Sequence, residues 1–362
     1  MAMQLKGAIQ RLTEEPDLKE ISLIAASDVD MEIDSFLLCL KESQIQKVVV
    51  WTDFLSSLQE DKMLEFLQLL PLLANLKELI FKSSSRFHVE IIPGEGLLSI
   101  RQIVGLKRLV FEDMQVTALQ TGFIQSLSDA MQNHASLQEV VLSNFFSNDW
   151  ANTEDDTLDP LFLAVATIPN LERLTFTGCG GYVLNCGQQV SLVSTRALAA
   201  VFQNASIEEL QLSFLELDDP QFETIAMQLA KNKSINSLAL DYHNLAEHGF
   251  CELMAAMETN QSIKNLSLRS LWNIGSKGFE EAMRMLRHNY WIESLSVTAS
   301  PSQQAEIDLY SRMNGAGRCL LREPGTSMSQ WVDVLAANSE DIDVVRSLLR
   351  EIPDLCKIAT RC

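Results

Sequence analysis

Residues Ile235 to Gln261, INSLALDYHNLAEHGFCELMAAMETNQ, decide the fold, because the residues that follow from Ile263 repeat their plan almost unchanged. The stretch begins with the L-x-x-L-x-L pattern of a buried strand and turns near Gly249. Its second half carries apolar residues at helical spacing, namely Phe250, Leu253, Met254 and Met257. One unit therefore predicts one strand and one helix. Neither can bury its apolar side alone, so the unit is stable only when it stacks on copies of itself.

The strand pattern starts ten times along the chain, at intervals of 27 to 36 residues. The starts are Leu18, Ile45, Leu76, Leu106, Leu137, Leu171, Ile207, Ile235, Ile263 and Ile292. This period predicts a solenoid of about ten strand–helix units over residues 18–300. Residues 1–17 carry a helical pattern that ends before Pro16, which predicts an N-terminal helical cap. The period stops at Pro301, and residues 301–362 predict a C-terminal helical cap, with a short irregular piece followed by two helices.

The pattern resembles the ribonuclease-inhibitor-like class of leucine-rich repeat proteins, whose units have about this length. The resemblance covers about Leu18 to Thr298. It implies a curved α/β solenoid, a horseshoe with parallel strands on the concave face and helices on the convex face. Eight residues into each unit such proteins usually carry Asn or Cys, and here only Cys179 fits well. Inhibitors, receptors, adaptors and GTPase activators all share this fold, so the fold does not choose among them.

The chain has 48 acidic and 28 basic side chains, which gives a formal charge of −20. Such a field repels phosphate backbones and anionic membranes, so we expect no nucleic acid and no membrane partner. A basic protein surface is the electrostatic complement, although the charge also serves solubility. Seven scattered cysteines without C-x-x-C spacing argue against a disulfide framework and structural zinc. With no signal peptide or long apolar run evident, we expect a cytoplasmic protein.

Four asparagines stand three residues before a strand start, where the preceding helix must end: Asn204, Asn232, Asn260 and Asn289. Asparagine tolerates the left-handed conformation, so we predict that they end these helices as left-handed C-caps. Three of the four also match N-glycosylation sequons, as does Asn265. Capping is the preferred interpretation because no signal peptide is evident.

No catalytic or cofactor-binding pattern is evident in the sequence. There is no P-loop, and GCGGYV fails the dinucleotide fingerprint because Val183 stands where the third glycine should be. The carboxylates near Trp150 lack the D-x-D-x-D-G order of a calcium loop. We therefore expect no enzyme, no cofactor and no metal site.

Side chains two, four and six places after each start should point away from the helices. In the two-place column the charge alternates over seven strands, through Glu20, Lys47, Glu78, Arg108, Glu139, Arg173 and Glu209. Neighbouring parallel strands lie about 4.8 Å apart, so these side chains can form a lateral ladder of ion pairs. We interpret the ladder as structural.

The four-place column is apolar on four adjacent strands, with Val49, Ile80, Val110 and Val141. Ile24 and Trp51 adjoin it from the six-place column. Such patches are typical of partner-binding sites, although burial under a neighbouring loop is an alternative. An insertion after the fifth strand adds Trp150 among acidic residues, a loop suited to a basic peptide.

These observations predict a non-enzymatic scaffold that binds a protein partner on the concave surface. The alternative is a regulator of a small GTPase or another enzyme, for which Arg173 and Arg269 are the candidate arginines. The partner and the oligomeric state do not follow from the sequence.

Overall fold

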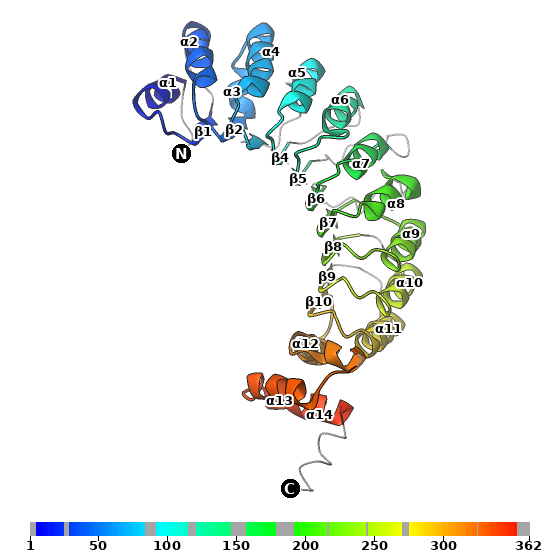
Figure 1. Ribbon diagram of the computed structural model, residues 1–362. Coiled ribbons are helices and arrows are strands. Elements are labelled where there is room, and N and C mark those ends of the chain that lie inside the picture. Colours follow the sequence, from blue (N-terminus) through cyan, green and yellow to red (C-terminus); the bar gives the residue numbers. More distant parts are fainter. Residues whose placement is uncertain are drawn as a thin grey trace. The chain divides into compact units, whose positions relative to one another are not determined.

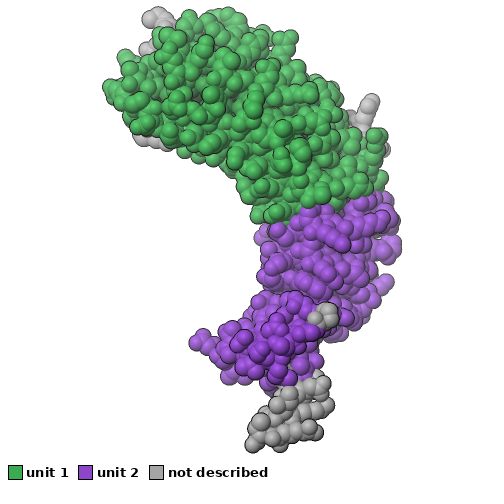
Figure 2. Space-filling model, in the orientation of Figure 1, with its two compact units in different colours: residues 1–216 green, residues 217–362 purple. Residues whose placement is uncertain are grey.

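The computed structural model describes residues 5–24, 29–83, 92–114, 121–145, 157–178, 192–215, 217–243, 245–269, 275–323 and 325–352. The chain forms two compact units, Met1–Glu216 and Leu217–Cys362 (Figure 2). The boundary lies inside the repeat region, between the seventh and eighth strands.

Unit 1 contains seven described strands that pair in parallel in chain order. They are β1 (Glu20–Leu23), β2 (Lys47–Trp51), β3 (Glu78–Lys82), β4 (Arg108–Glu112), β5 (Glu139–Ser143), β6 (Arg173–Thr177) and β7 (Glu209–Ser213). Each begins two residues after the start that the sequence pattern predicts. A strand of this kind buries alternate side chains against the helices and leaves the others on the opposite face.

Helices cover only one face of the unit 1 sheet, on the outer side of its bend (Figure 1). They are α1 (Leu5–Glu14), α2 (Val29–Lys41), α3 (Thr52–Ser56), α4 (Glu60–Leu69), α5 (Gly94–Leu98), α6 (Thr121–Met131), α7 (Asp159–Ala166) and α8 (Thr195–Gln203). Short 3-10 turns follow α4 and α5, namely η1 (Leu70–Leu72) and η2 (Ser99–Gln102). The arrangement confirms the α/β solenoid of leucine-rich-repeat type.

The helix of the third repeat is much shorter than the family resemblance implies. Helix α5 has only five residues before η2 begins. Within α5, a Cβ on Gly96 would lie 2.3 Å from the Cδ1 atom of Leu67. Glycine at this position allows α5 to pack directly against α4 in a single turn.

The core between sheet and helices contains a row of phenylalanines, one from each of four consecutive repeats. Phe81 and Phe111 stack with ring centroids 4.9 Å apart, and Phe111 meets Phe145 edge to face at 5.9 Å. Phe145 in turn meets Phe176 at 6.4 Å. These fully buried rings connect neighbouring repeats and contribute beyond their buried area.

Unit 2 continues the same plan with strands β8 (Ser237–Asp241), β9 (Asn265–Leu268) and β10 (Ser294–Val297), which pair in parallel. Its helices α9 (Asp219–Leu229), α10 (Glu247–Met257) and α11 (Gly275–His288) follow one another along one face (Figure 1). After β10 come α12 (Pro301–Gly315), the 3-10 turn η4 (Arg318–Arg322), α13 (Met328–Ala337) and α14 (Ile342–Glu351).

The expectation of a short irregular piece after Pro301 is wrong, because these residues form the 15-residue helix α12. A capping box starts it, in which Ser300 accepts from the Gln303 backbone and the Gln303 side chain accepts from the Ser300 N–H at 2.9 Å. Pro301 stands in the first turn, where its missing N–H costs nothing. Met313 then joins Trp331, Val344 and Leu348 in a small core between the last helices.

The four asparagines do stand at helix ends, but the predicted left-handed conformation is wrong. None of them is among the described residues with positive φ, and Asn204 has φ −66° and ψ 115°. They act through their side chains instead. The side-chain amide nitrogen of Asn289 donates to the backbone carbonyls of Met257 (2.7 Å) and Asn260 (2.8 Å) in the previous repeat. The amide oxygen accepts from the backbone N–H groups of the residues two and three places further along the chain.

The same bonding recurs along the chain, and we call the series Asn204, Asn260, Asn289 and Asn314 the amide ladder. Each donates from Nδ2 to two backbone carbonyl groups. Asn260 and Asn289 are almost fully buried. Because the whole amide is used, each side chain satisfies backbone groups that the end of a helix leaves unpaired.

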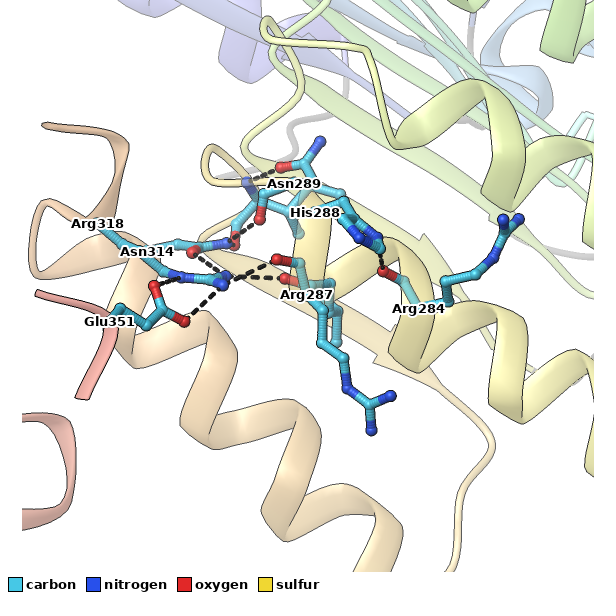
Figure 3. Close-up of polar contacts among 9 residues, drawn as sticks. Arg284, Arg287, His288, Asn289, Asn314, Arg318 and Glu351 are labelled. Atoms are coloured by element: carbon cyan, nitrogen blue, oxygen red, sulfur yellow. Dashed lines mark hydrogen bonds and ion pairs between the residues drawn. The ribbon is translucent and has the colours of Figure 1, made fainter. Parts of the chain in front are cut away.

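Arg318 ends the amide ladder with a guanidinium group (Figure 3). Its Nη1 and Nη2 atoms donate to the carbonyls of Leu286 and Arg287 at 2.9 Å each, at the end of α11. Its Nε and Nη2 atoms bind the Glu351 carboxylate of α14 at 2.8 Å each. The guanidinium also lies 4.3 Å from the centre of the Tyr290 ring. Arg318 thus joins the last helices to the last repeat.

Among the described residues, no helix has the length and apolar character needed to span a bilayer.

Candidate functional site

The face of the unit 1 sheet that carries no helix presents the side chains of three columns. We call it the open face of unit 1. The observed register places the two-place residues side by side from Glu20 on β1 to Glu209 on β7. Val49, Ile80, Val110 and Val141 are likewise direct neighbours on β2 to β5. The sequence pattern therefore predicted this surface in the correct register.

Ion pairs join most of the two-place residues into the expected ladder. Lys47 pairs with Glu20 at 3.0 Å, on β2 and β1. Arg108 bridges two strands, with 3.5 Å to Glu78 and 3.0 Å to Glu139. Arg173 then approaches Glu139 to 3.1 Å. These partly exposed pairs each contribute about 0 to 1 kcal/mol, so the ladder adds little to stability.

Glu139 is the best-connected carboxylate in this ladder. Burial by itself raises the pKa of Glu139, but hydrogen bonds from Arg108 and Arg173 outweigh it and hold the pKa below its usual value. The same contact raises the pKa of Arg173. Both partners therefore stay charged throughout the physiological range.

The apolar residues form one contiguous cluster, which we call the apolar row: Val49, Ile80, Val110, Val141 and Trp51. Trp51 and Val141 are half-buried, whereas Val49, Ile80 and Val110 are only 6%, 5% and 2% exposed. The row is less exposed than an open patch would be. A second ion pair, Lys82 to Glu112 at 2.5 Å, borders it on the six-place side. Short side chains thus lie between columns of long charged ones.

Trp51 has a defined position at the β2 end of the row. Its indole Nε1 donates to the Ser22 hydroxyl at 3.3 Å. The ring is half-buried, so part of it lies on the surface.

The remaining predicted residues are less informative. Ile24 is half-buried directly after β1 and is not part of the apolar row. Trp150, with Asp149 and Asp155 beside it, lies outside the described residues. The role of all these residues in binding stays a prediction.

The two candidate arginines differ. Arg173 belongs to the ladder of unit 1, whereas Arg269 follows β9 in unit 2. Arg269 donates from its backbone N–H to Asp241 Oδ1 at 2.8 Å and from Nε and Nη2 to Oδ2 at 3.3 and 3.0 Å. Asp241 is 2% exposed and also accepts from the Ser267 hydroxyl at 2.7 Å. A buried carboxylate therefore holds the exposed Arg269 side chain in place directly after β9.

Sequence reasoning missed Asp241. The signal was its place in the six-place column, next to Ser267 and Arg269 of the following repeat. An aspartate and an arginine in the same column of adjacent parallel strands can always meet.

Within the described ranges, no group of three or more His, Cys, Asp or Glu side chains could hold a metal ion. Cys39, Cys251 and Cys319 are free thiols. Burial raises the pKa of Cys251 and of Cys319, which disfavours the thiolate form that nucleophilic chemistry needs.

No protein-family model and no curated protein sequence match this chain. Solved structures that match include the actin-binding site 2 of leiomodin-1, at 20% identity and a TM-score of 0.34 over 37% of this chain and 79% of that one. The tropomodulin C-terminal domain of Caenorhabditis elegans matches at 13% identity and a TM-score of 0.35, over 56% of this chain and 99% of that one. TLR13, in a complex with ssRNA13, matches at 14% identity and a TM-score of 0.39, over 80% of this chain and 38% of that one. None of these similarities assigns a partner to this chain.

Proposed function

We propose that this chain belongs to the ribonuclease-inhibitor-like class of leucine-rich repeat proteins and is a non-enzymatic scaffold. Its partner is a protein that binds the open face of unit 1 over the apolar row. The single observation that supports the proposal is the apolar row itself. Val49, Ile80 and Val110 are largely covered, so the contact surface consists of the half-buried Trp51 and Val141 at the two ends of the row, on a face without helices.

Unit 2 provides the internal comparison for this argument. Its four-place column carries Ala239, Ser267 and Ser296, on strands with the same parallel pairing. The fold therefore accepts small side chains at this position. Val49, Ile80 and Val110 in unit 1 exceed what the architecture requires, which favours a role in binding.

The charge of the chain favours a basic partner over an acidic one during approach, because a net −20 attracts positive surfaces at long range. The acidic residues near Trp150 in the sequence belong to this part of the proposal. Once the partner is close, opening the exposed ion pairs around the apolar row costs little.

The test compares three purified variants of the full chain as bait in a native lysate. Trp51→Ala removes the aromatic ring and Val141→Arg places a charge at the other end of the apolar row. Val104→Arg is the matched control, because Val104 is 89% exposed and lies between η2 and β4, outside the row. All three should keep the circular dichroism spectrum and melting temperature of the wild type.

A captured protein is then purified and its Kd measured by calorimetry against each variant. We expect Trp51→Ala and Val141→Arg to weaken binding at least about tenfold, the usual effect at a central contact residue. Val104→Arg should bind like the wild type. Equal affinity of all variants would contradict the proposal.

A regulator of a GTPase or another enzyme is the second candidate, and Arg269 is the observation in its favour. A guanidinium oriented by a buried carboxylate can stabilise charge on a partner's reacting group at little entropic cost. Under this alternative, Arg269→Ala removes a stimulation of nucleotide hydrolysis by the isolated partner and leaves its affinity within about threefold of the wild type.

A further inference from the structure

We propose that Tyr290, Trp291 and Arg322 form a second binding surface, which recognises an anionic side chain on a protein segment. We call these three residues the Arg322 site. Tyr290 and Trp291 lie between α11 and β10, and Arg322 is the last residue of η4. The site belongs to unit 2, whereas the apolar row belongs to unit 1. The inference therefore goes beyond the proposed function and does not rest on it.

The ring of Tyr290 contacts two guanidinium groups that differ in what else they bind. The Cζ atom of Arg318 lies 4.3 Å from the ring centre and that of Arg322 lies 4.7 Å from it. Arg318 is buried and donates to two backbone carbonyls and to the side chains of Asn314 and Glu351. Arg322 is exposed, and no described residue accepts a hydrogen bond from its guanidinium. Its N–H donors are therefore available to a ligand.

The other described arginines of unit 2 show what is special about Arg322. Those that pair with a carboxylate are Arg269, Arg284, Arg287, Arg312 and Arg318. Arg322, Arg346 and Arg350 form no ion pair with any described residue. Of these three, Arg322 alone rests on an aromatic ring in the described structure. It is thus held in place while its donors stay unused, whereas Arg346 and Arg350 are solvated.

A guanidinium held in this way is suited to bind an oxyanion. Its planar edge offers parallel N–H groups that match the oxygens of a carboxylate or a phosphate. The stack on Tyr290 covers one face of the guanidinium and uses none of the N–H groups. Because the side chain is already positioned, less conformational entropy is lost when a ligand binds.

Trp291 adds an aromatic surface beside the cation. Its ring is half-buried and meets Tyr290 edge to face, with ring centroids 6.2 Å apart. No described residue accepts a hydrogen bond from its indole N–H. Trp, Tyr and Arg are the residue types enriched among those that dominate protein interfaces. We therefore expect the ligand to carry an aromatic residue next to its anionic one.

The distribution of charge allows an anion to approach this part of the chain. Unit 1 contains 14 basic and 29 acidic side chains, whereas unit 2 contains 14 and 19. Near the site, Glu306 and Glu351 are already bonded to other arginines. Glu323 follows Arg322 in the chain, is exposed and forms no ion pair with it. Glu323 is thus a carboxylate that opposes an anionic ligand here.

The experiment selects displayed random peptides on the immobilised full chain. Peptides that also bind an Arg322→Gln variant are removed first, so those that remain depend on Arg322. We expect them to carry Asp or Glu next to an aromatic residue. The side chain of Arg322 is exposed, so the variant should keep the circular dichroism spectrum and melting temperature of the wild type.

Synthetic copies of a selected peptide then distinguish a carboxylate from a phosphate. The three copies differ at the acidic position, which is Glu, phosphoserine or Gln, and calorimetry gives each Kd. We expect the Gln copy to bind at least about tenfold more weakly than the better charged copy, which identifies the preferred oxyanion. The difference should vanish on Arg322→Gln, and Arg322→Lys should retain only part of it.

Three further variants serve as controls. Arg350→Gln removes an exposed arginine that has no ion pair and no ring contact, and should leave the affinity unchanged. Glu323→Gln should strengthen binding by up to about threefold, a gain that no folding defect can imitate. Trp51→Ala, in unit 1, should have no effect on these peptides, so this inference and the proposed function can fail independently.

The opposite results would overturn the Arg322 site. If no peptide depends on Arg322, or if the dependent peptides carry no acidic residue, Arg322 does no more than cover the ring of Tyr290. A preference for the charged copies that survives Arg322→Gln, or that Arg350→Gln reduces equally, would also contradict the assignment.

Discussion

Two ways of joining neighbouring repeats occur in the molecule: strand side chains join the repeats of unit 1, and side-chain amides join the helix ends from Asn204, late in unit 1, and throughout unit 2. In unit 1 the repeats meet through strand side chains, with stacked phenylalanines in the core and ion pairs on the open face. In unit 2 the buried amides of Asn260 and Asn289 and the guanidinium of Arg318 join the helix ends. Apolar contacts spread stability over many residues, whereas a buried polar group concentrates it in a few.

This difference explains where each unit can tolerate change. The open face of unit 1 can vary because its charged residues are partly exposed and contribute little to stability. The asparagines at the helix ends of unit 2 cannot be replaced as easily, because removal of one side-chain amide leaves several buried backbone groups without hydrogen-bond partners. The open-face side chains of unit 1 and the helix ends of unit 2 thus differ in how much substitution they tolerate.

The largest expected effect is at Arg318, where the amide ladder ends. Arg318→Met removes a buried charge and leaves two backbone carbonyls and the Glu351 carboxylate without their donor. We expect a loss of about 3 to 5 kcal/mol in the stability of α12 to α14. Hydrogen exchange should show lost protection in α13 and α14 before the strands of unit 2 are affected.

Arg312→Met is the matched control for this variant. Arg312 is exposed and pairs with Asp341 on the surface at 2.5 Å. Its loss should cost less than about 1 kcal/mol. If both arginine variants show the same exchange pattern, Arg318 is not the residue that joins the last helices to the repeats.

The second prediction concerns the amide ladder itself. Asn289→Ala removes two donated and two accepted hydrogen bonds in a fully buried position, for an expected loss of about 2 to 3 kcal/mol. Asn265→Ala is the control, because Asn265 is exposed on β9 and should change stability by less than about 0.5 kcal/mol. Urea denaturation of both variants checks the difference.

The sequence predicted the strands, their order and the charge ladder because these follow from periodicity alone. A repeat of about 30 residues fixes which residues are neighbours on adjacent strands, so the pairing of Arg108 with Glu139 followed from counting. The apolar row followed in the same way. The low exposure of the apolar row could not be predicted from the period, because exposure depends on where the long neighbouring side chains lie.

The sequence did not show how the helices end. An asparagine at a helix end fits both a left-handed backbone and a side chain that reaches the previous repeat, and local propensity favours the first. In Asn260 and Asn289 the side chain reaches the previous repeat, because it bonds backbone carbonyls there. Asp241 was missed for a related reason, since its burial depends on Ser267 and Arg269 of the next repeat.

The third prediction tests whether the helix-end amide bonding can be extended to an earlier repeat of unit 1. His134 stands three residues before the strand start at Leu137, the position of the asparagines. Its Nε2 contacts the Ile100 carbonyl at 3.3 Å, as an asparagine amide would. Its buried Nδ1 has no hydrogen-bond partner. His134→Asn would place a carbonyl oxygen there to accept from residues 136 and 137, and we expect a gain of about 1 kcal/mol at neutral pH.

The pH dependence of stability separates this effect from simple repacking. Burial lowers the pKa of His134, and the Ile100 contact offsets only part of that. The folded pKa is therefore below the unfolded value of about 6.5, so the unfolded chain binds more protons as the pH falls below about 6.5. The wild type should lose stability there by up to about 1.4 kcal/mol per pH unit through this group. His134→Asn should lack that contribution, and an unchanged slope would contradict the assignment.

The smallest expected effect is at Glu139 on the open face of unit 1. Glu139→Gln keeps the shape of the side chain and removes the charge shared by Arg108 and Arg173. Because the folded pKa of Glu139 is lowered, its stabilising contribution is present above the unfolded value of about 4.3 and is lost as the pH falls through the folded pKa. We expect a loss below about 1 kcal/mol at neutral pH that disappears in acid and shrinks in high salt. Urea denaturation at two pH values and two salt concentrations measures it. A loss as large as that of Asn289→Ala would mean that the charge ladder stabilises unit 1 as strongly as the amides stabilise unit 2, and the open face would then be part of the architecture and not a surface free to bind a partner.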